Sequence, residues 1–332
     1  MILKELKKNE LSNILSFYLP IPKSSVFSRM QTGRVIESTG SWYKVDIGNE
    51  IINSRLPGKF RLDKKEVTNP ITVGDIVDLE VNKDGSGNIL KIHDRQNYIT
   101  RQATHGKRGE HILVSNLDQA FVVQSIRDPK LNEGFINRFL VTCEAYDVTA
   151  GIIINKMDLA KKGDLEFVED MVDVYSSIGY AVYSCSIDDD NSIEQLKSLF
   201  KDKISAFIGP SGVGKTSILN AIDPDYNLKV GEISSSSNKG KHTTTFARLI
   251  PLEIGGFVAD TPGIREFGLV NIEDWELSLY FPEMLKPREL CKFNTCTHIH
   301  EPGCGVIAAF ENGEIDPNRY HSYINMLESL EN

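Results

Sequence analysis

The stretch Gly209-Pro-Ser-Gly-Val-Gly-Lys-Thr-Ser217 matches the phosphate-loop pattern G-x-x-x-x-G-K-[ST], in which glycines let backbone N–H groups surround phosphate oxygens. It follows an apolar run, 204–208, expected to be a buried strand, and precedes 217–222, expected to open a helix. A glycine-rich turn without a ligand is the alternative, but the flanking strand and helix favour a nucleotide site. Lys215 would reach the terminal phosphates and Thr216 would ligate Mg²⁺. The expected nucleotide contacts are Gly209, Pro210, Ser211, Gly212, Val213, Gly214, Lys215, Thr216 and Ser217.

A second motif, Asn155-Lys-Met-Asp158, directly follows the apolar run Ile152-Ile-Ile154. Ligands of sheets in which strands alternate with helices bind at the carboxyl ends of the strands. A carboxylate at Asp158 can accept hydrogen bonds from both the ring N–H and the exocyclic amine of guanine. Adenine lacks this donor pair and would leave the acid unpaired, which is costly. We therefore expect a guanine site made by Asn155, Lys156, Met157 and Asp158.

A third motif, Asp260-Thr-Pro-Gly263, follows the apolar run 256–259. We expect Asp260 to hold Mg²⁺ through water and the Gly263 N–H to contact the γ-phosphate. Residues 234–245 are polar and contain glycine, as expected of a segment that γ-phosphate and Mg²⁺ order, although a solvated loop has the same composition. The threonine that completes the metal site is one of Thr243, Thr244 and Thr245, of which we favour Thr244.

The order of these motifs along the chain is unusual. GTPases normally carry the phosphate loop first and Asn-Lys-x-Asp last, whereas here 155–158 precedes 209–217. This order predicts a circularly permuted domain, in which the usual ends are joined before Ile204 and new ends open after the Asp260 motif. Termini of domains often lie close together, which makes such a change tolerable. The segment after Gly263 then leads directly into the C-terminal region.

Four potential metal ligands lie in that C-terminal region: Cys291, Cys296, His298 and Cys304. Three thiolates and an imidazole suit a closed tetrahedral Zn²⁺ site, which is structural because it leaves no open position. His300, two residues after His298, is an alternative ligand. The two other cysteines, Cys143 and Cys185, are most simply buried small apolar residues.

Periodicity divides the chain into parts of different class. Five short strand-like segments within 29–97 predict an OB-type β-barrel, a fold that often binds oligonucleotides. From about residue 112, apolar strands alternate with helical runs, which predicts a doubly wound parallel sheet. We therefore expect a multidomain α/β protein. Its domains are an N-terminal helical extension (1–28), an OB domain (29–97), a circularly permuted GTPase domain (98–268) and a zinc-binding helical domain (269–332).

Charge and hydropathy restrict the partners of the chain. No apolar run approaches the about 18–20 residues of a membrane span, and the start lacks the apolar core of a signal peptide, so we expect a cytoplasmic protein without membrane contact. The net charge is −9, but residues 1–110 carry +5 and the remainder −14. A basic N-terminal third suits contact with a phosphate backbone, although ordinary surface variation is an equal alternative.

The barrel segment contains side chains suited to stacking on bases and binding phosphates: Trp42, Tyr43, Phe60, Arg55, Lys59, Arg61, Lys64 and Lys65. For each aromatic residue taken singly, burial in the barrel core is the favoured interpretation.

The permuted order, the phosphate loop, Asp260-Thr-Pro-Gly263 and the C-x₄-C-x-H-x₅-C pattern together resemble one family, the circularly permuted, ribosome-small-subunit-dependent GTPases (RsgA-type ribosome biogenesis factors). The resemblance covers roughly residues 29–330. It implies that GTP, GDP, Mg²⁺ and one structural Zn²⁺ are the cofactors, and that all three domains touch 16S rRNA. It also implies a role in late maturation of the 30S subunit, with hydrolysis stimulated by that subunit and linked to release of the factor. We expect a monomer.

Some positions depart from the family pattern. The segment Ser184-Cys-Ser-Ile187 stands where a guanine-supporting Ser-Ala element is expected, and Ser186 fits its spacing best. Ile264 follows Gly263 where many GTPases have a glutamine that orients water, so intrinsic turnover should be slow. His242 resembles the family's candidate for positioning water and would act with Lys215 in catalysis; a solvated loop histidine is the alternative.

Two other functions fit part of these motifs. The phosphate loop also matches nucleoside-monophosphate kinases, guanylate kinase in particular, but such a kinase has no need for the motifs at 155–158 and 260–263. A GTP-gated RNA-binding module with negligible turnover is the second alternative. It remains possible because Ile264 stands where many GTPases have the glutamine that orients water.

Overall fold

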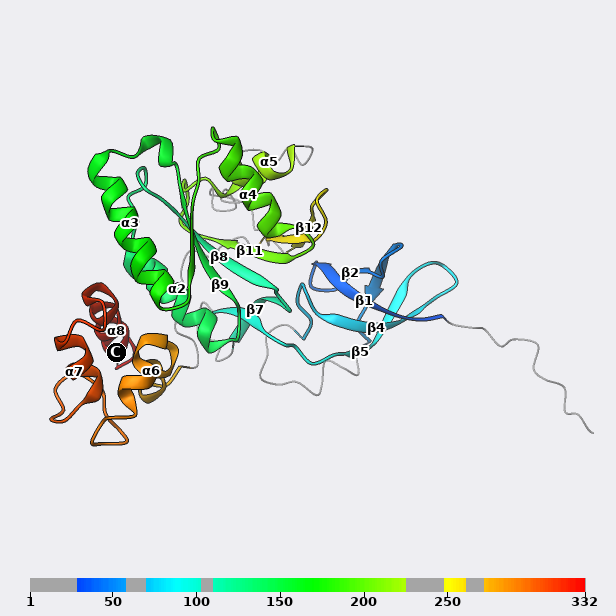
Figure 1. Cartoon of the computed structure of the whole chain (residues 1–332). Coiled ribbons are helices and arrows are strands. Elements are labelled where there is room, and N and C mark those ends of the chain that lie inside the picture. Colours follow the sequence, from blue (N-terminus) through cyan, green and yellow to red (C-terminus); the bar gives the residue numbers. More distant parts are fainter. Residues whose placement is uncertain (1–28, 58–69, 103–109, 225–247, 261–271, 332) are drawn as a thin grey trace, which may run out of the picture.

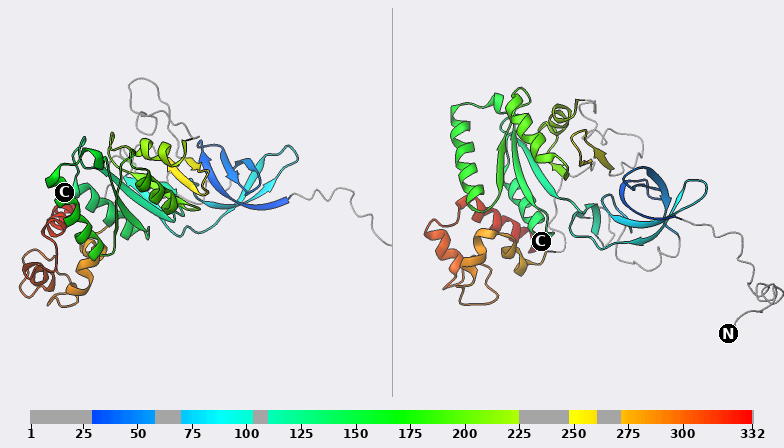
Figure 2. Two further views of the ribbon diagram at one scale, coloured as in Figure 1. Left: turned by 45° about the horizontal axis from the view of Figure 1, so that its top comes forward. Right: turned by 45° about the vertical axis from the view of Figure 1, so that its right-hand side comes forward.

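The computed structural model describes residues 29–57, 70–102, 110–224, 248–260 and 272–331. A small β-barrel, a central sheet flanked by helices, and a group of C-terminal helices follow one another in space, with the sheet in the middle (Figures 1 and 2). The predicted N-terminal helical extension, 1–28, lies outside the described residues.

The barrel consists of five strands, as predicted: β1 (Arg29–Ser38), β2 (Tyr43–Asp46), β3 (Ile51–Arg55), β4 (Ile76–Val81) and β5 (Gly87–Ile92). β1 pairs with both β2 and β4, and a parallel pairing of β3 with β5 closes the ring. These pairings give each of the five strands two neighbours. Residues such as Val35, Val45 and Leu79 fill the interior, and the OB-type prediction is confirmed.

Two adjacent aromatic residues of the barrel have opposite environments. Tyr43 is 3% exposed and belongs to the core, as predicted, whereas Trp42 is 41% exposed. The core interpretation is therefore wrong for Trp42. It lies in the turn before β2, where the guanidinium of Arg55 is 4.4 Å from the centroid of its ring. Phe60 and the lysines near it lie outside the described residues.

The central sheet contains five parallel strands in the order β10 (Ala181–Ser184), β9 (Ala150–Asn155), β8 (Gln119–Ser125), β11 (Ile204–Ile208) and β13 (Phe257–Asp260). The antiparallel strand β12 (Arg248–Pro251) pairs with β13 at one edge. The parallel strands alternate with helices along the chain, so the predicted parallel sheet is confirmed.

Helices cover both faces of this sheet (Figure 1). Val122 of β8 packs in the cluster that contains α2 (Glu133–Ala145) and α3 (Lys162–Ser177). Its neighbours Phe121 and Val123 pack with α4 (Asp190–Phe200) and α5 (Lys215–Ile222). Successive side chains of a strand point to opposite faces, so one buried strand supplies both cores. The predicted doubly wound arrangement is confirmed.

The barrel is joined to the central sheet by elements that the sequence analysis did not predict. β12 pairs with β1 at Glu37 and Arg248, and the hairpin of β6 (Tyr98–Gln102) and β7 (Glu110–Ser115) follows the barrel. Asp75, whose side chain is fully buried, accepts hydrogen bonds from Ser115 Oγ (2.6 Å) and Arg95 Nε (2.7 Å). This buried charge is paired, as a buried carboxylate must be.

The C-terminal helices are η5 (Asp274–Tyr280), α6 (Pro282–Arg288), α7 (Gly305–Glu311) and α8 (Pro317–Glu331). Their core contains Phe281, Met284, Val306 and Tyr323, and Val141 of α2 also belongs to it. The same apolar cluster therefore includes residues of the central domain and of the C-terminal helices.

A buried polar network strengthens this junction. Arg319 of α8 is 1% exposed and donates to both carboxylate oxygens of Glu283, at 2.6 and 3.1 Å, and to Asn137 Oδ1 of α2 at 2.9 Å. Tyr175 of α3 donates to the same Asn137 oxygen at 2.8 Å. Burial alone would lower the pKa of Arg319, but Glu283 raises it, so the guanidinium stays charged. The ion pair therefore joins α8 to α6, and the hydrogen bond from Arg319 to Asn137 joins α8 to α2, so a buried hydrogen bond supports the apolar contact at this junction.

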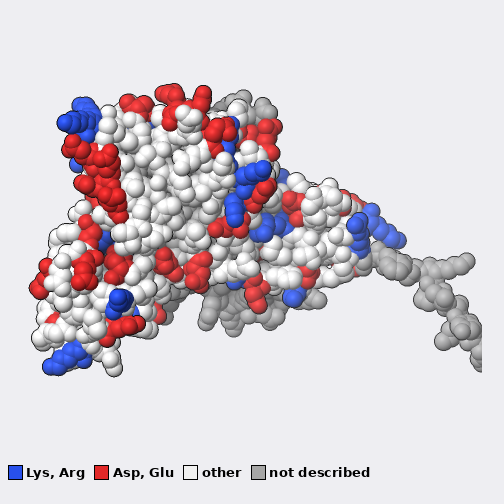
Figure 3. Space-filling view, viewed as in Figure 1, with Lys and Arg blue, Asp and Glu red and all other residues white. Residues whose placement is uncertain are grey.

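Acidic side chains gather over α3 on the face shown in Figure 3, while Lys and Arg side chains mark the far end of the barrel. The acidic residues of α3 are Asp164, Glu166, Glu169, Asp170 and Asp173. Within the described parts of the chain, no helix combines the length and apolar character that crossing a membrane requires.

Candidate nucleotide site and metal centre

The phosphate loop, 209–214, connects the end of β11 to the first residue of α5. A Cβ atom on Gly209 would lie 2.2 Å from the carbonyl oxygen of Val123 on the neighbouring strand. Gly214 has φ +97°, and a Cβ there would lie 2.2 Å from Asn155 Nδ2. Both positions require glycine because the loop packs directly against the ends of two other segments.

Lys215 and Thr216 lie in the first turn of α5, as the motif predicts. The Lys215 ammonium donates to the carbonyl oxygens of Gly209 (2.7 Å) and Pro210 (2.9 Å), which holds its charge over the loop. Thr216 is buried beside it at 8% exposure. The ammonium and the N–H groups of the helix start are therefore close together, an arrangement that suits an anionic phosphate.

The guanine motif is joined to the phosphate loop through Asn155, the last residue of β9. Its side chain is 2% exposed, and Nδ2 donates to the Val213 carbonyl oxygen at 2.9 Å. The Cys185 thiol donates to Asn155 Oδ1, with 3.4 Å between sulfur and oxygen. Burial raises the pKa of Cys185 to about 12, so the thiol keeps the proton that it donates. Cys143 and Cys185 are both buried, as predicted, but this hydrogen bond of Cys185 was not predicted.

Asp158 lies in the short helix η3 (Met157–Leu159) that follows β9, and its side chain is exposed. Ser186 Oγ donates to Asp158 Oδ1 at 2.8 Å, and Met157 N donates to the Cys185 carbonyl oxygen at 3.2 Å. The structure thus brings the proposed supporting serine to the carboxylate. An oriented carboxylate keeps further lone pairs for the paired donors of a guanine edge.

Lys156, between these two residues, has a left-handed backbone with φ +62°. Its ammonium donates to the carbonyl oxygen of Asp128, which follows β8. This contact joins residues 28 positions apart. No motif marks Asp128, so sequence analysis could not find it.

The remaining predicted residues of the nucleotide site are described only in part. The backbone of Asp260 ends β13, the strand beside β11. Thr244, His242, Gly263 and Ile264 lie outside the described residues, and their roles remain predictions.

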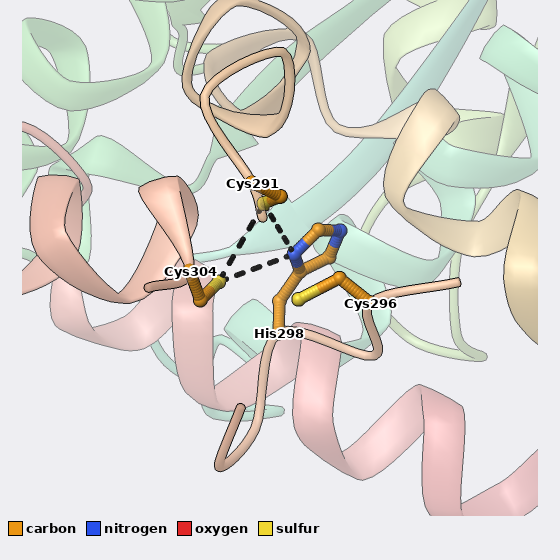
Figure 4. A group of neighbouring side chains, drawn as sticks. All are labelled: Cys291, Cys296, His298 and Cys304. Carbon is orange, nitrogen blue, oxygen red and sulfur yellow. Dashed lines mark hydrogen bonds between the residues drawn. The ribbon is translucent and has the colours of Figure 1, made fainter. Parts of the chain in front are cut away.

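The four predicted metal ligands converge in the loop between α6 and α7 (Figure 4). The ligand atoms of Cys291, Cys296, His298 and Cys304 all lie within 4.8 Å of one another. Cys291 Sγ is 3.8 Å from Cys304 Sγ, and His298 Nδ1 is 3.5 and 3.4 Å from these two sulfurs. Sulfur and nitrogen atoms bound tetrahedrally to Zn²⁺ are separated by about 3.5–3.8 Å, so the donor set fits a zinc ion. His300 is exposed and is not part of the group.

Neighbouring hydrogen bonds hold the loop that carries the predicted metal ligands. Tyr320 OH donates to the carbonyl oxygen of His298 at 2.6 Å, and Tyr323 OH donates to that of Thr297 at 2.8 Å. Burial and the charge of Arg288 lower the pKa of His298, which favours the neutral imidazole that binds metals.

Glu301 accepts hydrogen bonds from several residues of the loop that carries the predicted metal ligands. It accepts from the backbone N–H and hydroxyl of Thr297, both at 2.6 Å, and from the N–H groups of Ile299 and His300. Burial acts to raise the pKa of Glu301, but these hydrogen bonds outweigh it and lower the pKa to about 2. The carboxylate therefore stays ionised across the physiological pH range.

Comparisons with known proteins find relatives over most of the chain. The chain is 41% identical over 300 residues to small ribosomal subunit biogenesis GTPase RsgA 2 of Bacteroides thetaiotaomicron, covering 90% of this chain and 97% of that protein. It is 42% identical over 301 residues to the RsgA of Flavobacterium psychrophilum, covering 90% and 92%. The crystal structure of YjeQ from Thermotoga maritima matches with a TM-score of 0.75 at 36% identity, over 91% of this chain and 99% of that chain.

Family comparisons cover most of the described fold. The RsgA GTPase family matches residues 92–270, and the RsgA N-terminal domain family matches residues 32–89. The structure of YloQ, described as a circularly permuted GTPase, matches with a TM-score of 0.72 at 32% identity, over 93% of this chain and 97% of that one. These matches exclude the guanylate-kinase alternative and agree with the permuted order of the motifs. The chain therefore belongs to the RsgA family of circularly permuted GTPases and is a GTP hydrolase.

Proposed function

We propose that this protein acts in late maturation of the 30S ribosomal subunit, and that GTP controls how tightly it holds that particle. The observation that carries the proposal is the hydrogen bond from Asn155 to Val213, which joins a guanine motif to a phosphate loop. The joint occurs in a chain whose relatives are named small ribosomal subunit biogenesis GTPases.

The proposed nucleotide site divides into two halves. Asn155, Lys156, Met157 and Asp158, with Ser186, would hold the guanine base, while 209–217 would hold the phosphates. Mg²⁺, when bound, would neutralise charge on the β- and γ-phosphates, and Thr216, Thr244 and Asp260 are its proposed ligands. Gly263 would contact the γ-phosphate, Lys215 would stabilise the charge that develops on it, and His242 would position the attacking water.

The proposed zinc centre has a structural role. Cys291, Cys296, His298 and Cys304 supply four ligand atoms, which fills a tetrahedral shell and leaves no position for a substrate. The ion would fix the loop between α6 and α7.

The barrel supplies the best supported contact with 16S rRNA. The ring of Trp42 is exposed, and the Arg55 guanidinium lies over it, so stacking and phosphate binding are available at one place. Base stacking on aromatic side chains combined with basic residues is the usual means of binding single-stranded RNA. In this proposal the OB domain (29–97), the GTPase domain (98–268) and the zinc domain (269–332) touch the 30S subunit together, as a monomer in the cytoplasm.

The proposed cycle uses the segments that the phosphate motifs predict to respond to GTP. GTP would order 234–245 and the chain after Asp260, and this state would bind the subunit tightly. Hydrolysis would relax both segments and release the protein.

The test is the rate of GTP hydrolysis with purified 30S subunits, with 50S subunits and with neither, at low and at moderate salt. We expect a large increase that is specific to 30S and that weakens as salt rises, because contacts to a phosphate backbone depend on salt. An equal rate in all three mixtures would show that the 30S subunit does not stimulate hydrolysis, and would overturn the proposal. It would not contradict the proposed nucleotide site.

A further inference from the structure

The loop that joins β8 to α2, residues 126–132 (the β8–α2 loop), contacts the guanine motif although it contains no nucleotide-binding pattern. Ile126 N donates to the Asn155 carbonyl oxygen at 3.0 Å. The Asp128 carbonyl oxygen accepts from the Lys156 ammonium. The loop therefore supports the backbone of one motif residue and the side chain of the next.

An ion pair fixes the β8–α2 loop to the segment that follows the motif. Arg127 Nε donates to Asp164 Oδ2 at 2.7 Å, and the two side chains are 38% and 23% exposed. The same carboxylate oxygen accepts from Lys161 N at 2.7 Å, at the start of α3. The hydrogen bond from Arg127 is the main reason that the pKa of Asp164 is lowered, so this carboxylate is ionised at neutral pH.

The guanine motif is thus held from three sides. Asn155 is bound to the phosphate loop, and Asp158 is bound to Ser186. Lys156, whose left-handed backbone conformation is unfavourable for a residue with a side chain, is held by Asp128. The first two contacts use motif residues, whereas the third depends on where the β8–α2 loop lies.

We propose that Arg127 and Asp164 are a positioning pair for guanine recognition. By holding the β8–α2 loop against the start of α3, they place the Asp128 carbonyl oxygen that orients Lys156, and they thereby slow the dissociation of a guanine nucleotide. The inference rests on the proposed guanine site and adds two residues that do not touch the nucleotide.

The chain offers a matched control for this pair. Lys197 and Glu194 of α4 form an ion pair of the same length, 2.7 Å, on a helix that covers the other face of the sheet. Loss of that pair removes a similar surface interaction without affecting the β8–α2 loop.

The experiment measures dissociation of a fluorescent GDP analogue from the full-length protein by displacement with unlabelled GDP. Arg127→Met and Asp164→Asn should each speed dissociation about three- to fivefold, the range expected of a partly exposed ion pair. The double variant should be no faster than the faster single variant, because both changes break one interaction. Arg127→Lys should restore part of the slow rate, and Glu194→Gln should leave it unchanged.

Unchanged dissociation in Arg127→Met and Asp164→Asn would overturn the inference, as would effects that multiply in the double variant. An equal effect of Glu194→Gln would also overturn it, because the change would then not be local. Thermal unfolding of each variant identifies general loss of stability. If the unaltered protein binds GDP no better than ADP, the proposed guanine site fails instead, so the two failures are distinguishable.

Discussion

The nucleotide site and the metal centre both consist of side chains predicted from short motifs, but the fold assembles them differently. Asn155 and Val213 are 58 positions apart and meet because β9, β8 and β11 are neighbours in one parallel sheet. The metal ligands all lie within 291–304, where the described chain forms turns between two helices of seven residues each.

This difference indicates what holds each site in place. The nucleotide residues stand at the ends of strands whose side chains fill two apolar clusters, so the protein itself positions them. The predicted metal ligands lie in irregular chain, where four bonds to a bound ion would supply cross-links that secondary structure does not. We therefore expect removal of the metal to unfold its surroundings, and removal of the nucleotide to leave its site in place.

Loss of the metal should have the largest effect on structure. Cys291→Ser, or removal of the ion by a chelator, should strongly lower the free energy of unfolding of the C-terminal helices. Structural zinc contributes about 10 kcal/mol or more to the folding of small zinc domains. Hydrogen exchange in 272–331 should rise strongly, while GDP affinity should change less than about twofold. Cys143→Ala removes a buried thiol outside the cluster and should keep the metal. A parallel collapse of GDP affinity would contradict the separation of the two sites.

The junction between the two sites should be the next most sensitive place. Arg319→Met would leave Glu283, whose side chain is 4% exposed, as a buried carboxylate without its partner. Breaking a buried pair in this way costs about 3–5 kcal/mol of the free energy of unfolding. Denaturant unfolding measures the loss, and Lys197→Met, at a partly exposed pair, is the control. A loss below about 1 kcal/mol would show that the buried pair of α6 and α8 contributes little to stability.

Lys215→Ala should weaken the nucleotide site without affecting the metal. The variant loses charge-assisted hydrogen bonds to phosphate, so GDP and GTP affinity should fall about 100-fold or more. Nucleotide titration gives the affinity and metal analysis gives the zinc content, which should not change. Normal affinity would contradict the assignment of the phosphate loop.

Ser186→Ala should have the smallest effect. It removes the hydroxyl that orients Asp158, which is worth about 1 kcal/mol, or about a fivefold loss of GDP affinity. Ser198→Ala, on the exposed surface of α4, serves as the matched control. Equal affinities in the two variants would show that Asp158 needs no support from Ser186.

Features encoded by local pattern were predictable from the sequence. Apolar alternation gave the five barrel strands, apolar runs gave the parallel strands, and spacing gave the four metal ligands. The sequence favoured His298 over His300 as the fourth ligand, and the structure confirms this, because the His298 ring lies among the sulfurs whereas His300 is exposed.

Features that depend on a single tertiary contact were not predictable. A charged residue such as Arg319 is normally expected at the surface, but here it is buried and pairs with Glu283, 36 positions away. The exposure of Trp42 depends on the shape of one turn, and the role of the Asp128 carbonyl oxygen depends on how the β8–α2 loop lies against β9. Backbone carbonyl groups carry no sequence signal, so such contacts are visible only in the folded chain.

In the proposed site, Asp158 is held by Ser186 and follows Asn155, which binds the phosphate loop, and its carboxylate selects guanine. The most direct test compares GTP and xanthosine triphosphate as substrates of the protein and of Asp158→Asn. An asparagine offers one donor and one acceptor to the base, which matches the xanthine edge and mismatches guanine. We predict that the variant accepts xanthosine triphosphate and that its preference for GTP falls about 100-fold. An unchanged preference for GTP would show that Asp158 does not read the base.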